Sequence, residues 1–412
     1  MFRYIESILL FSLLSVNLNC GNLAEETEFP DGGLLKFATP LPAAASQYFS
    51  GNFSAAYAGL DRFGGSVSVL WAENRLSIFT PSSANYAVLA AGCIEQDVLF
   101  EGAYRDPVNQ EKGLIRLYIR AADGGSALCA GSIPGQIAFE GTFGENFYNL
   151  KNNVRLAFAH PLKSTSAFLN IAHRGGCRTV DSCGVSENTL QVISLASSLG
   201  ANGIEIDVNR TSDGVPILYH DEDYNTRLVK GIFCLGPVQE MPYINTRIFC
   251  KLKQGEKIPT LREALNLILT LPNIRFVWLD PKTTAIMHST VLLAKEFNQL
   301  AVNAGRNLEI VVGLPDGDFL GAFLNLPEHV GVPCLAEESV AMADAGACKY
   351  YGPRWTAGYQ TDAGNYLHSA GKKILFWTLD EPGFVFEFLN KANPDGFITN
   401  RPYMIFAIQQ YR

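Results

Sequence analysis

The sequence predicts an α/β protein whose larger part is a distorted (β/α)₈ TIM barrel, preceded by an all-β sandwich or barrel. From about residue 165 onwards, apolar strands alternate with helical stretches, which is typical of a parallel sheet. The segment 165–412 also has the length of about 250 residues at which such a barrel closes. Segment 47–160 contains short alternating runs separated by turn residues instead, and this pattern favours antiparallel strands.

Residues 1–20 are expected to be a signal peptide. Residues 8–16 are an apolar run of signal-peptide length, too short to span a bilayer, and Arg3 precedes them. Cys20 stands where a bacterial lipoprotein carries its lipid-modified cysteine. Alternatives are a buried N-terminal helix for this segment, and a discarded cysteine or free thiol for Cys20. We therefore expect an exported protein, which is secreted, periplasmic or anchored at the surface as a lipoprotein.

Two further segments precede the predicted TIM barrel. Residues 21–46 are polar and rich in Gly, Pro and Ala, which is typical of a tether. In 47–160 the hydrophobic residues alternate, for example over 66–71 and 114–120, and turn residues separate the runs. This segment has no cluster of carboxylates or histidines, so we interpret it as a structural or binding module.

The predicted barrel of 165–412 is built from apolar strands that end in polar residues. These strands are 169–173, 204–208, 216–220, 276–280, 308–312 and 374–378. The helical stretches are 188–199, 261–271, 284–304, 358–370 and 383–391. Thr260 and Glu263 form a capping box at the start of one helix. The tight turn 211–214 leaves no room for a helix, so we expect a local distortion there, followed by an inserted loop over 222–257.

Eight cysteines remain after Cys20, mostly in close sequential pairs. The simplest framework is Cys93–Cys129, Cys177–Cys183, Cys234–Cys250 and Cys334–Cys348, although eight cysteines allow 105 pairings. Disulfides in this number indicate an oxidising compartment.

The net charge of the chain limits the classes of partner that we expect it to bind. The chain has a net charge of −8 and no run of Lys and Arg, so nucleic acid is a poor partner candidate. No protein partner is evident from the sequence, and the expected partner is a small molecule.

Three carboxylates point to a divalent cation. Glu205 and Asp207 are two positions apart on a strand, so their side chains share one face, which points inward in a barrel. Two buried carboxylates repel each other, and a divalent cation is the usual remedy. Asp280 ends another strand and is well placed as the third ligand, although it also fits a helix N-cap.

Two histidines and two cations complete the candidate site. His173 and His220 each end a predicted strand, where one acts as general base and the other as acid to the leaving alkoxide. Arg174 is a natural phosphate clamp, and Lys282 lies where it can meet a phosphate oxygen. This set is the inventory for metal-assisted cleavage of a phosphodiester.

The stretch 165–412 resembles the glycerophosphodiester phosphodiesterase family. The matching motifs are His173-Arg174-Gly175-Gly176, Glu187-Asn188-Thr189, Glu205-Ile206-Asp207-Val208, Thr211-Ser212-Asp213-Gly214, His220-Asp221, Ile258-Pro259-Thr260-Leu261, Phe376-Trp377-Thr378 and the run from Asp395 to Pro402. The resemblance implies a TIM barrel that uses Ca²⁺ or Mg²⁺ and cleaves glycerophosphodiesters to glycerol 3-phosphate and an alcohol. It also implies that Trp377 lines the glycerol pocket and that Glu187 contacts the substrate.

The sequence departs from the family pattern at several places. Asp280-Pro281-Lys282 replaces the usual Glu-x-Lys and resembles the sphingomyelinase D relatives, and Ser186 replaces a proline. A disulfide between Cys177 and Cys183 is expected to stiffen the substrate entrance. The alternatives are therefore a lysophospholipase D or sphingomyelinase D activity on lipid headgroups and, from another class, a non-catalytic surface binding protein.

Overall fold

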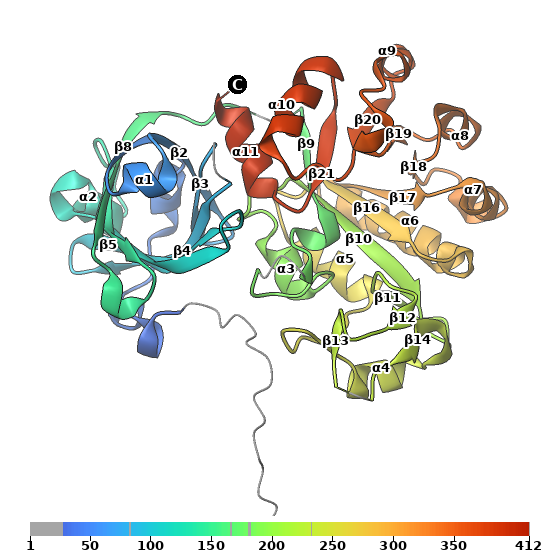
Figure 1. Ribbon diagram of the computed structural model, residues 1–412, viewed down its shortest axis with the longest axis horizontal. Helices are drawn as coiled ribbons and strands as arrows, with labels where there is room; N and C mark the ends of the chain where they lie inside the picture. Colours follow the sequence, from blue (N-terminus) through green and yellow to red (C-terminus); the bar gives the residue numbers. More distant parts are fainter. Residues whose placement is uncertain (1–27, 82–83, 165–166, 180–182, 232, 412) are drawn as a thin grey trace, which may run out of the picture.

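Two barrels lie side by side in the protein. The computed structural model describes residues 28–81, 84–164, 167–179, 183–231 and 233–411. The expected signal peptide and Cys20 lie outside these residues. Figure 1 shows an antiparallel barrel in blue to green and a parallel barrel in green to red, with the C-terminal helix between them. No helix among the described residues has the length and apolar character needed to cross a bilayer.

The first barrel contains eight antiparallel strands. They are β1 (Gly51–Tyr57), β2 (Ser66–Ala72), β3 (Arg75–Phe79), β4 (Tyr86–Ile94), β5 (Asp97–Asp106), β6 (Glu111–Ile119), β7 (Ala138–Gly144) and β8 (Asn152–His160). Each strand pairs with its neighbour in sequence, and β1 also pairs with β8, which closes the ring. Aromatic side chains such as Phe53, Phe100 and Phe139 fill its interior, with ring centroids 5.2–5.4 Å apart. The alternating pattern therefore predicted the antiparallel strands correctly. Because the ring of strands is closed, the fold of this segment is a barrel and not a sandwich.

Residues 28–46 do not form the tether that the composition suggested. They make 3₁₀ turns at Pro30–Gly32, Leu35–Phe37 and Ala43–Tyr48 and pack against the first barrel. The backbone N–H groups of Leu34 and Leu35 donate to the buried Glu101 carboxylate at 2.8 and 3.0 Å. These two hydrogen bonds supply donors to the buried Glu101 carboxylate of β5, so residues 28–46 belong to the same folded unit as the antiparallel barrel.

The second barrel has eight parallel strands. They are β9 (Leu169–Ala172), β10 (Gly203–Arg210), β16 (Phe276–Pro281), β17 (Glu309–Leu314), β18 (Cys334–Ala336), β19 (Tyr350–Tyr351), β20 (Lys373–Phe376) and β21 (Gly396–Thr399). β9 pairs with both β10 and β21 and so closes the ring. This arrangement confirms the predicted TIM-barrel fold.

Helices cover the outside of the parallel barrel. They are α3 (Leu190–Leu195), α5 (Leu261–Leu269), α6 (Met287–Asn303), α7 (Gly317–Leu324), α8 (Val340–Ala345), α9 (Thr361–Ser369), α10 (Pro382–Lys391) and α11 (Pro402–Tyr411). The capping box predicted at Thr260 and Glu263 is present at the start of α5. The main core lies between these helices and the strands.

The barrel is distorted where the turn 211–214 predicted it. β11 (Pro216–Leu218) lies within the predicted strand 216–220, and it pairs antiparallel with β10 and lies outside the closed ring. The reason is that the turn is too short for a crossover helix, so the chain must reverse. The insertion 222–257 follows with β12 (Asp223–Tyr224), β13 (Val229–Lys230), β14 (Gly236–Pro237), α4 (Tyr243–Phe249) and β15 (Lys251–Leu252).

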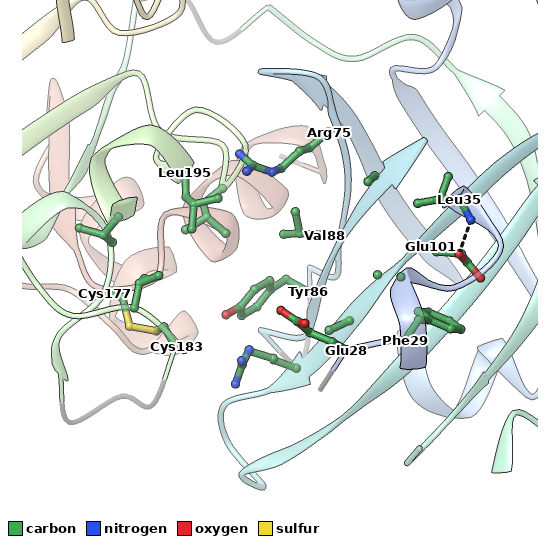
Figure 2. A pocket seen from close by; sticks show the side chains of 18 residues that line it. Glu28, Phe29, Leu35, Arg75, Tyr86, Val88, Glu101, Cys177, Cys183 and Leu195 are labelled. Carbon is green, nitrogen blue, oxygen red and sulfur yellow. Dashed lines mark hydrogen bonds between the residues drawn. A yellow bond between two sulfur atoms is a disulfide. The ribbon is translucent and has the colours of Figure 1, made fainter. Parts of the chain in front are cut away.

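Aromatic side chains join the two barrels. Phe79 packs edge-on against Phe406 of α11 at 5.4 Å, and Tyr86 stacks on Tyr403 at 4.3 Å between ring centroids. A cavity of about 450 Å³ lies beside this contact, between β4, β5 and α3, and Figure 2 shows Tyr86 and the Cys177–Cys183 disulfide at its wall.

Candidate active site

The predicted site residues meet in one pocket at the carboxyl ends of the parallel strands. Its cavity measures about 470 Å³. Among its lining residues are His173, Arg174, Glu205, Asp207, His220, Asp280, Lys282 and Trp377. The pocket is lined by both predicted histidines, the three predicted carboxylates and the two predicted cations, although they come from distant parts of the sequence.

The carboxylate cluster is formed by two neighbouring strands. Glu205 and Asp207 lie on β10, and Asp207 is directly opposite Asp280 in the parallel register with β16. One oxygen from each of the three carboxylates lies within 4.8 Å of the others. Glu205 and Asp207 are buried on one face of β10. Ile204, Ile206 and Val208 alternate with them, point to the opposite face and pack in the main core. The period of two along the strand therefore builds the cluster.

The close approach of three carboxylates and their burial shift the pKa values within the cluster. Burial, followed by the charges of Asp207 and Asp280, raises the pKa of Glu205 well above its usual range. Burial alone would also raise the pKa of Asp207, but Lys282, Arg174 and His220 outweigh it and hold that pKa low.

Lys282 sits among these carboxylates. Its ammonium group pairs with Asp207 at 2.6 Å and with Asp280. Burial opposes the charge on Lys282, but the carboxylates outweigh burial and raise its pKa. The side chain thus neutralises part of the cluster.

The donor set fits a hard divalent cation. Glu205 Oε1 and Asp280 Oδ1 are buried and have no hydrogen-bond partner among the described residues. Unpaired buried carboxylate oxygens are costly, and oxygen atoms are the ligands that Ca²⁺ and Mg²⁺ take. Glu205, Asp207 and Asp280 are therefore the residues able to hold such an ion.

His173 is held by a chain of hydrogen bonds that sequence reasoning did not identify. Its Nδ1 lies 2.7 Å from Asn400 Oδ1, and the Asn400 amide nitrogen donates to Asp380 at 2.5 Å. Because the amide nitrogen is engaged, Asn400 offers its oxygen, so Nδ1 carries the proton and Nε2 is the free base. Nε2 lies 3.8 Å from Glu205 Oε2. Burial and then Arg174 lower the pKa of His173 to about 4, which keeps it neutral.

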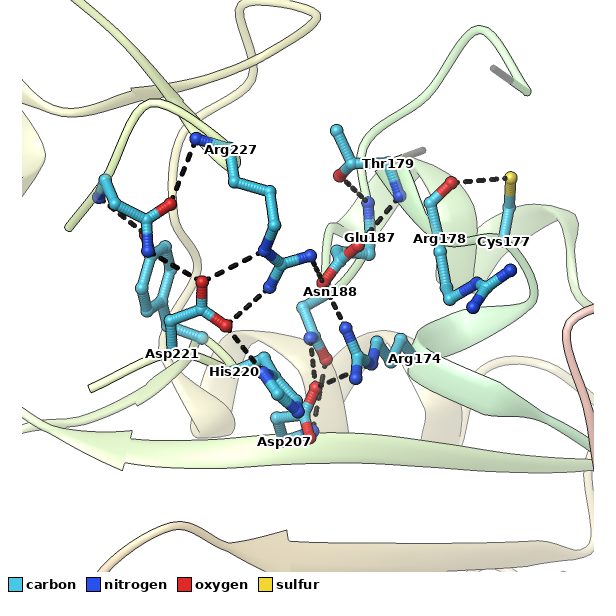
Figure 3. Close-up of polar contacts among 12 residues, drawn as sticks. Arg174, Cys177, Arg178, Thr179, Glu187, Asn188, Asp207, His220, Asp221 and Arg227 are labelled. Atoms are coloured by element: carbon cyan, nitrogen blue, oxygen red, sulfur yellow. Dashed lines mark hydrogen bonds and ion pairs between the residues drawn. The ribbon is translucent and has the colours of Figure 1, made fainter. Parts of the chain in front are cut away.

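His220 is held by a second chain, which Figure 3 shows. Its Nδ1 lies 2.7 Å from Asp221 Oδ1, and Arg227 donates to both oxygens of Asp221 at 2.5 and 3.0 Å. The guanidinium of Arg227 also lies 3.6 Å from Glu187. The insertion 222–257 therefore supplies a residue that fixes the orientation of His220.

Arg174 is placed by its backbone and by Glu187. Its φ of 54° is in the left-handed region, and its N–H donates to Glu205 Oε2 at 2.8 Å. Its guanidinium donates to Glu187 at 2.7 Å, while Nε lies 3.6 Å from Asp207 without a hydrogen bond. Glu187 was expected to contact the substrate, but both its oxygens are engaged within the protein, since Thr179 N–H donates to the second at 2.7 Å. It positions Arg174.

The Cys177–Cys183 disulfide has a different place from the one expected. It was predicted to stiffen the substrate entrance, but it lines the cavity between the barrels and not the pocket that contains His173. Thr179, which lies in the same loop, reaches the site only through Glu187. The three other disulfides join Cys93 to Cys129, Cys234 to Cys250 and Cys334 to Cys348.

Two further residues of the pocket follow strands that were not predicted. Glu337 comes directly after β18 and has one buried carboxylate oxygen without a partner among the described residues. Burial and then the charge of Asp280 raise its pKa well above the usual range. Arg354 follows β19, and its guanidinium lies over the Trp377 ring at 4.8 Å. The signal that would have found both is their position at a strand end, but these strands have only three and two residues.

Known proteins resemble this chain over the same region. A sequence model of the glycerophosphoryl diester phosphodiesterase family matches residues 173–404. Glycerophosphodiester phosphodiesterase 1 of Rattus norvegicus is 37% identical over 149 residues, which are 35% of this chain and 43% of the rat protein. A glycerophosphodiester phosphodiesterase of Caldanaerobacter subterraneus is 40% identical over 102 residues, 24% of this chain and 40% of that protein. The matched stretches thus span less than half of these relatives.

Two solved structures also align with this chain. A phosphodiesterase of Oleispira antarctica, determined with the product sn-glycerol-3-phosphate, has a TM-score of 0.47 and 22% identity, covering 58% of this chain and 95% of that one. A glycerophosphodiester phosphodiesterase of Parabacteroides distasonis has a TM-score of 0.48 and 23% identity, covering 60% and 99%. The match at 173–404 takes in more than half of the chain. The chain therefore belongs to the glycerophosphoryl diester phosphodiesterase family.

Proposed function

We propose that the protein hydrolyses glycerophosphodiesters to glycerol 3-phosphate and an alcohol, using Ca²⁺ or Mg²⁺ held by Glu205, Asp207 and Asp280. The observation that carries the proposal is a single pocket, in a chain of this family, that contains two oriented histidines beside three carboxylates. A cation bound there supplies positive charge that polarises the phosphate.

The two histidines are the candidates for proton transfer. His173 is neutral and presents a free Nε2 to the pocket, which suits a general base that takes the proton of the attacking hydroxyl. His220 donates its Nδ1–H to Asp221, and in its imidazolium form it carries a second proton on Nε2 that it gives to the leaving alkoxide. The attacking group is water or a neighbouring hydroxyl of the substrate, and a cyclic phosphate product would identify the second route.

The remaining residues bind and orient the phosphodiester. Arg174 is fixed by Glu187 and has an unpaired Nε near the carboxylates, so it is the candidate clamp for a phosphate oxygen. Lys282 is the second candidate cation. The partly buried Trp377 donates its Nε1–H to Gly352 O at 2.6 Å, which fixes the ring in the pocket wall, where it is the candidate to contact the glycerol carbons.

The direct test measures glycerol 3-phosphate release from glycerophosphocholine with Ca²⁺ or Mg²⁺, and then after EDTA. We expect release that EDTA abolishes and added metal restores, because without the cation the phosphate loses the positive charge that polarises it. Release that persists unchanged in EDTA would contradict the metal dependence. The same assay on lysophospholipid tests the lipid-headgroup alternative, which the aspartate at position 280 favours, and absence of turnover on both substrates would leave a binding protein.

We also infer that the protein works outside the cytoplasm. Four disulfides within one chain are typical of an oxidising compartment. Determining the mature N-terminus by mass spectrometry tests the expected signal peptide and the lipid on Cys20.

A further inference from the structure

Exposed apolar side chains gather on the insertion 222–257. Among its described residues, five large hydrophobic side chains are exposed: Phe233 (75%), Leu235 (47%), Ile244 (61%), Ile248 (59%) and Phe249 (47%). A soluble surface usually scatters such residues singly, and a contiguous group marks an interaction site. We call these five residues, together with Lys230, Lys251 and Lys253, the insertion patch.

Two structural features hold the apolar part of the patch together. Ile244 and Ile248 are four positions apart on α4, so they lie on one face of that helix. Cys234 and Cys250 are buried and disulfide-bonded, with their Cα atoms 5.1 Å apart. Phe233, Leu235 and Phe249 are the chain neighbours of these two cysteines. The disulfide therefore keeps the two exposed segments side by side.

The basic part of the patch lies on the two-stranded ribbon of β13 and β15. Lys230 is directly opposite Lys251, while the next pair, Val229 and Leu252, is buried. Lys251 begins β15, and Lys253 follows the strand directly after the buried Leu252. Like charges directly opposite each other destabilise a pair of strands. None of the three ammonium groups has an ion pair or hydrogen bond with any residue of the described ranges. An anionic partner would relieve this repulsion.

The charge of the insertion contrasts with that of the chain. Residues 222–257 contain six Lys or Arg and four Asp or Glu, against 32 and 40 in the whole protein. Exposed apolar side chains next to unpaired lysines are the combination that binds an anionic lipid surface, where the apolar groups enter the interface and the lysines meet headgroups. A second copy of the chain is a poor occupant, because apposed patches would bring lysines against lysines.

The patch belongs to the same insertion that supports the candidate active site. Arg227 holds Asp221 beside His220, and Glu256 accepts hydrogen bonds from the N–H and hydroxyl of Ser186 at 2.8 Å each. Figure 1 shows α4, β12, β13 and β14 projecting from the parallel barrel at the bottom of the view. We propose that the insertion patch docks the protein on anionic phospholipid bilayers.

The test is cosedimentation of the full-length chain with phosphatidylcholine vesicles, with and without phosphatidylserine. We expect binding to the phosphatidylserine vesicles, and weakening by high salt because salt screens exposed charges. Lys251→Gln/Lys253→Gln should weaken the binding by about tenfold or more, and Ile244→Ser/Ile248→Ser should weaken it on the same vesicles. The matched controls, Lys151→Gln/Lys373→Gln and Ile133→Ser/Val302→Ser, change exposed residues elsewhere and should bind like the wild type.

Each other outcome overturns the proposal. Absence of binding by the wild type does so, as does equal loss in the control variants. A dimer in sedimentation velocity that Ile244→Ser/Ile248→Ser converts to monomer, without vesicle binding by the wild type, would assign the patch to a second copy. Turnover of soluble glycerophosphocholine is measured in parallel and should be unchanged in all four variants. Failure of that activity with intact vesicle binding would count against the proposed reaction and not against the docking surface.

Discussion

At the scale of single residues, the site depends on side chains that orient other side chains. His173 presents a free Nε2 only because Asn400 accepts its Nδ1 proton, and Asn400 is turned the right way only because its amide nitrogen donates to Asp380. The motifs named His173 but not this support. Hydrogen-bond partners that are more than two hundred residues apart in sequence leave no local pattern.

His173→Ala should lower kcat on glycerophosphocholine by about 10² to 10⁴, the usual loss when a general acid or base is removed. The fold should persist, since the change leaves only a small space at the edge of an open pocket. Steady-state kinetics together with circular dichroism check both points. His368→Ala is the matched control, because His368 pairs with Asp395 away from the pocket and should keep full activity. Full activity in His173→Ala would remove the histidine pair from the mechanism.

Asp280→Asn should weaken Ca²⁺ or Mg²⁺ binding by about tenfold or more. The variant loses one ligand charge, while Lys282 stays paired with Asp207 and competes for it. Isothermal titration calorimetry measures the affinity directly and does not depend on turnover. Asp362→Asn changes an exposed aspartate on α9 and should bind the ion as the wild type does. Equal affinity in both variants would exclude Asp280 from the metal site.

At the scale of elements, the insertion 222–257 orients His220 in the candidate active site through Arg227. Arg227→Gln should lower kcat by about tenfold with a smaller effect on KM, because Asp221 loses its fixed partner and His220 its fixed orientation. Arg262→Gln breaks a surface ion pair with Glu296 and serves as control. If kcat were retained and KM rose, Arg227 would instead be a residue that contacts the substrate.

Elements with strong local signals were predictable, and very short ones were not. The capping box of Thr260 and Glu263 marked the start of α5, and alternation along β10 placed Glu205 and Asp207 on one face. β18 and β19 have three and two residues, too few for a hydrophobic pattern to stand out. Glu337 and Arg354 follow these strands, so no local pattern placed them in the pocket.

The strand Pro216–Leu218 shows a different limit. Its apolar pattern predicted a strand correctly, but a pattern of side chains contains no information on strand direction. Direction followed from the turn 211–214, which is too short for a crossover.

At the scale of the whole molecule, the two barrels share part of one core. Phe406→Ala should destabilise the protein by about 3–5 kcal/mol, because Phe406 is nearly fully buried where α11 meets β3. Differential scanning calorimetry should show a lower transition temperature. Phe37→Ala removes an aromatic ring that is mostly exposed and should leave the transition in place. Equal transitions for Phe406→Ala and the wild type would mean that this contact contributes little.

The relation of the two barrels could not be predicted from the sequence. Phe79 and Phe406 are separated by most of the chain, and each looks like an ordinary core residue of its own segment. The packing of residues 28–46 was missed for a related reason. Their polar, Gly- and Pro-rich composition matches a tether, and only the position of Glu101 reveals what their N–H groups bind.

The closure of the antiparallel barrel has a consequence for aggregation. An open sheet ends in strands whose unpaired N–H and C=O groups invite foreign chains to add on, and this is how cross-β aggregates begin. In the ring from β1 to β8, every strand has a neighbour on both sides. The antiparallel barrel therefore presents no open strand edge to which another chain could add a strand.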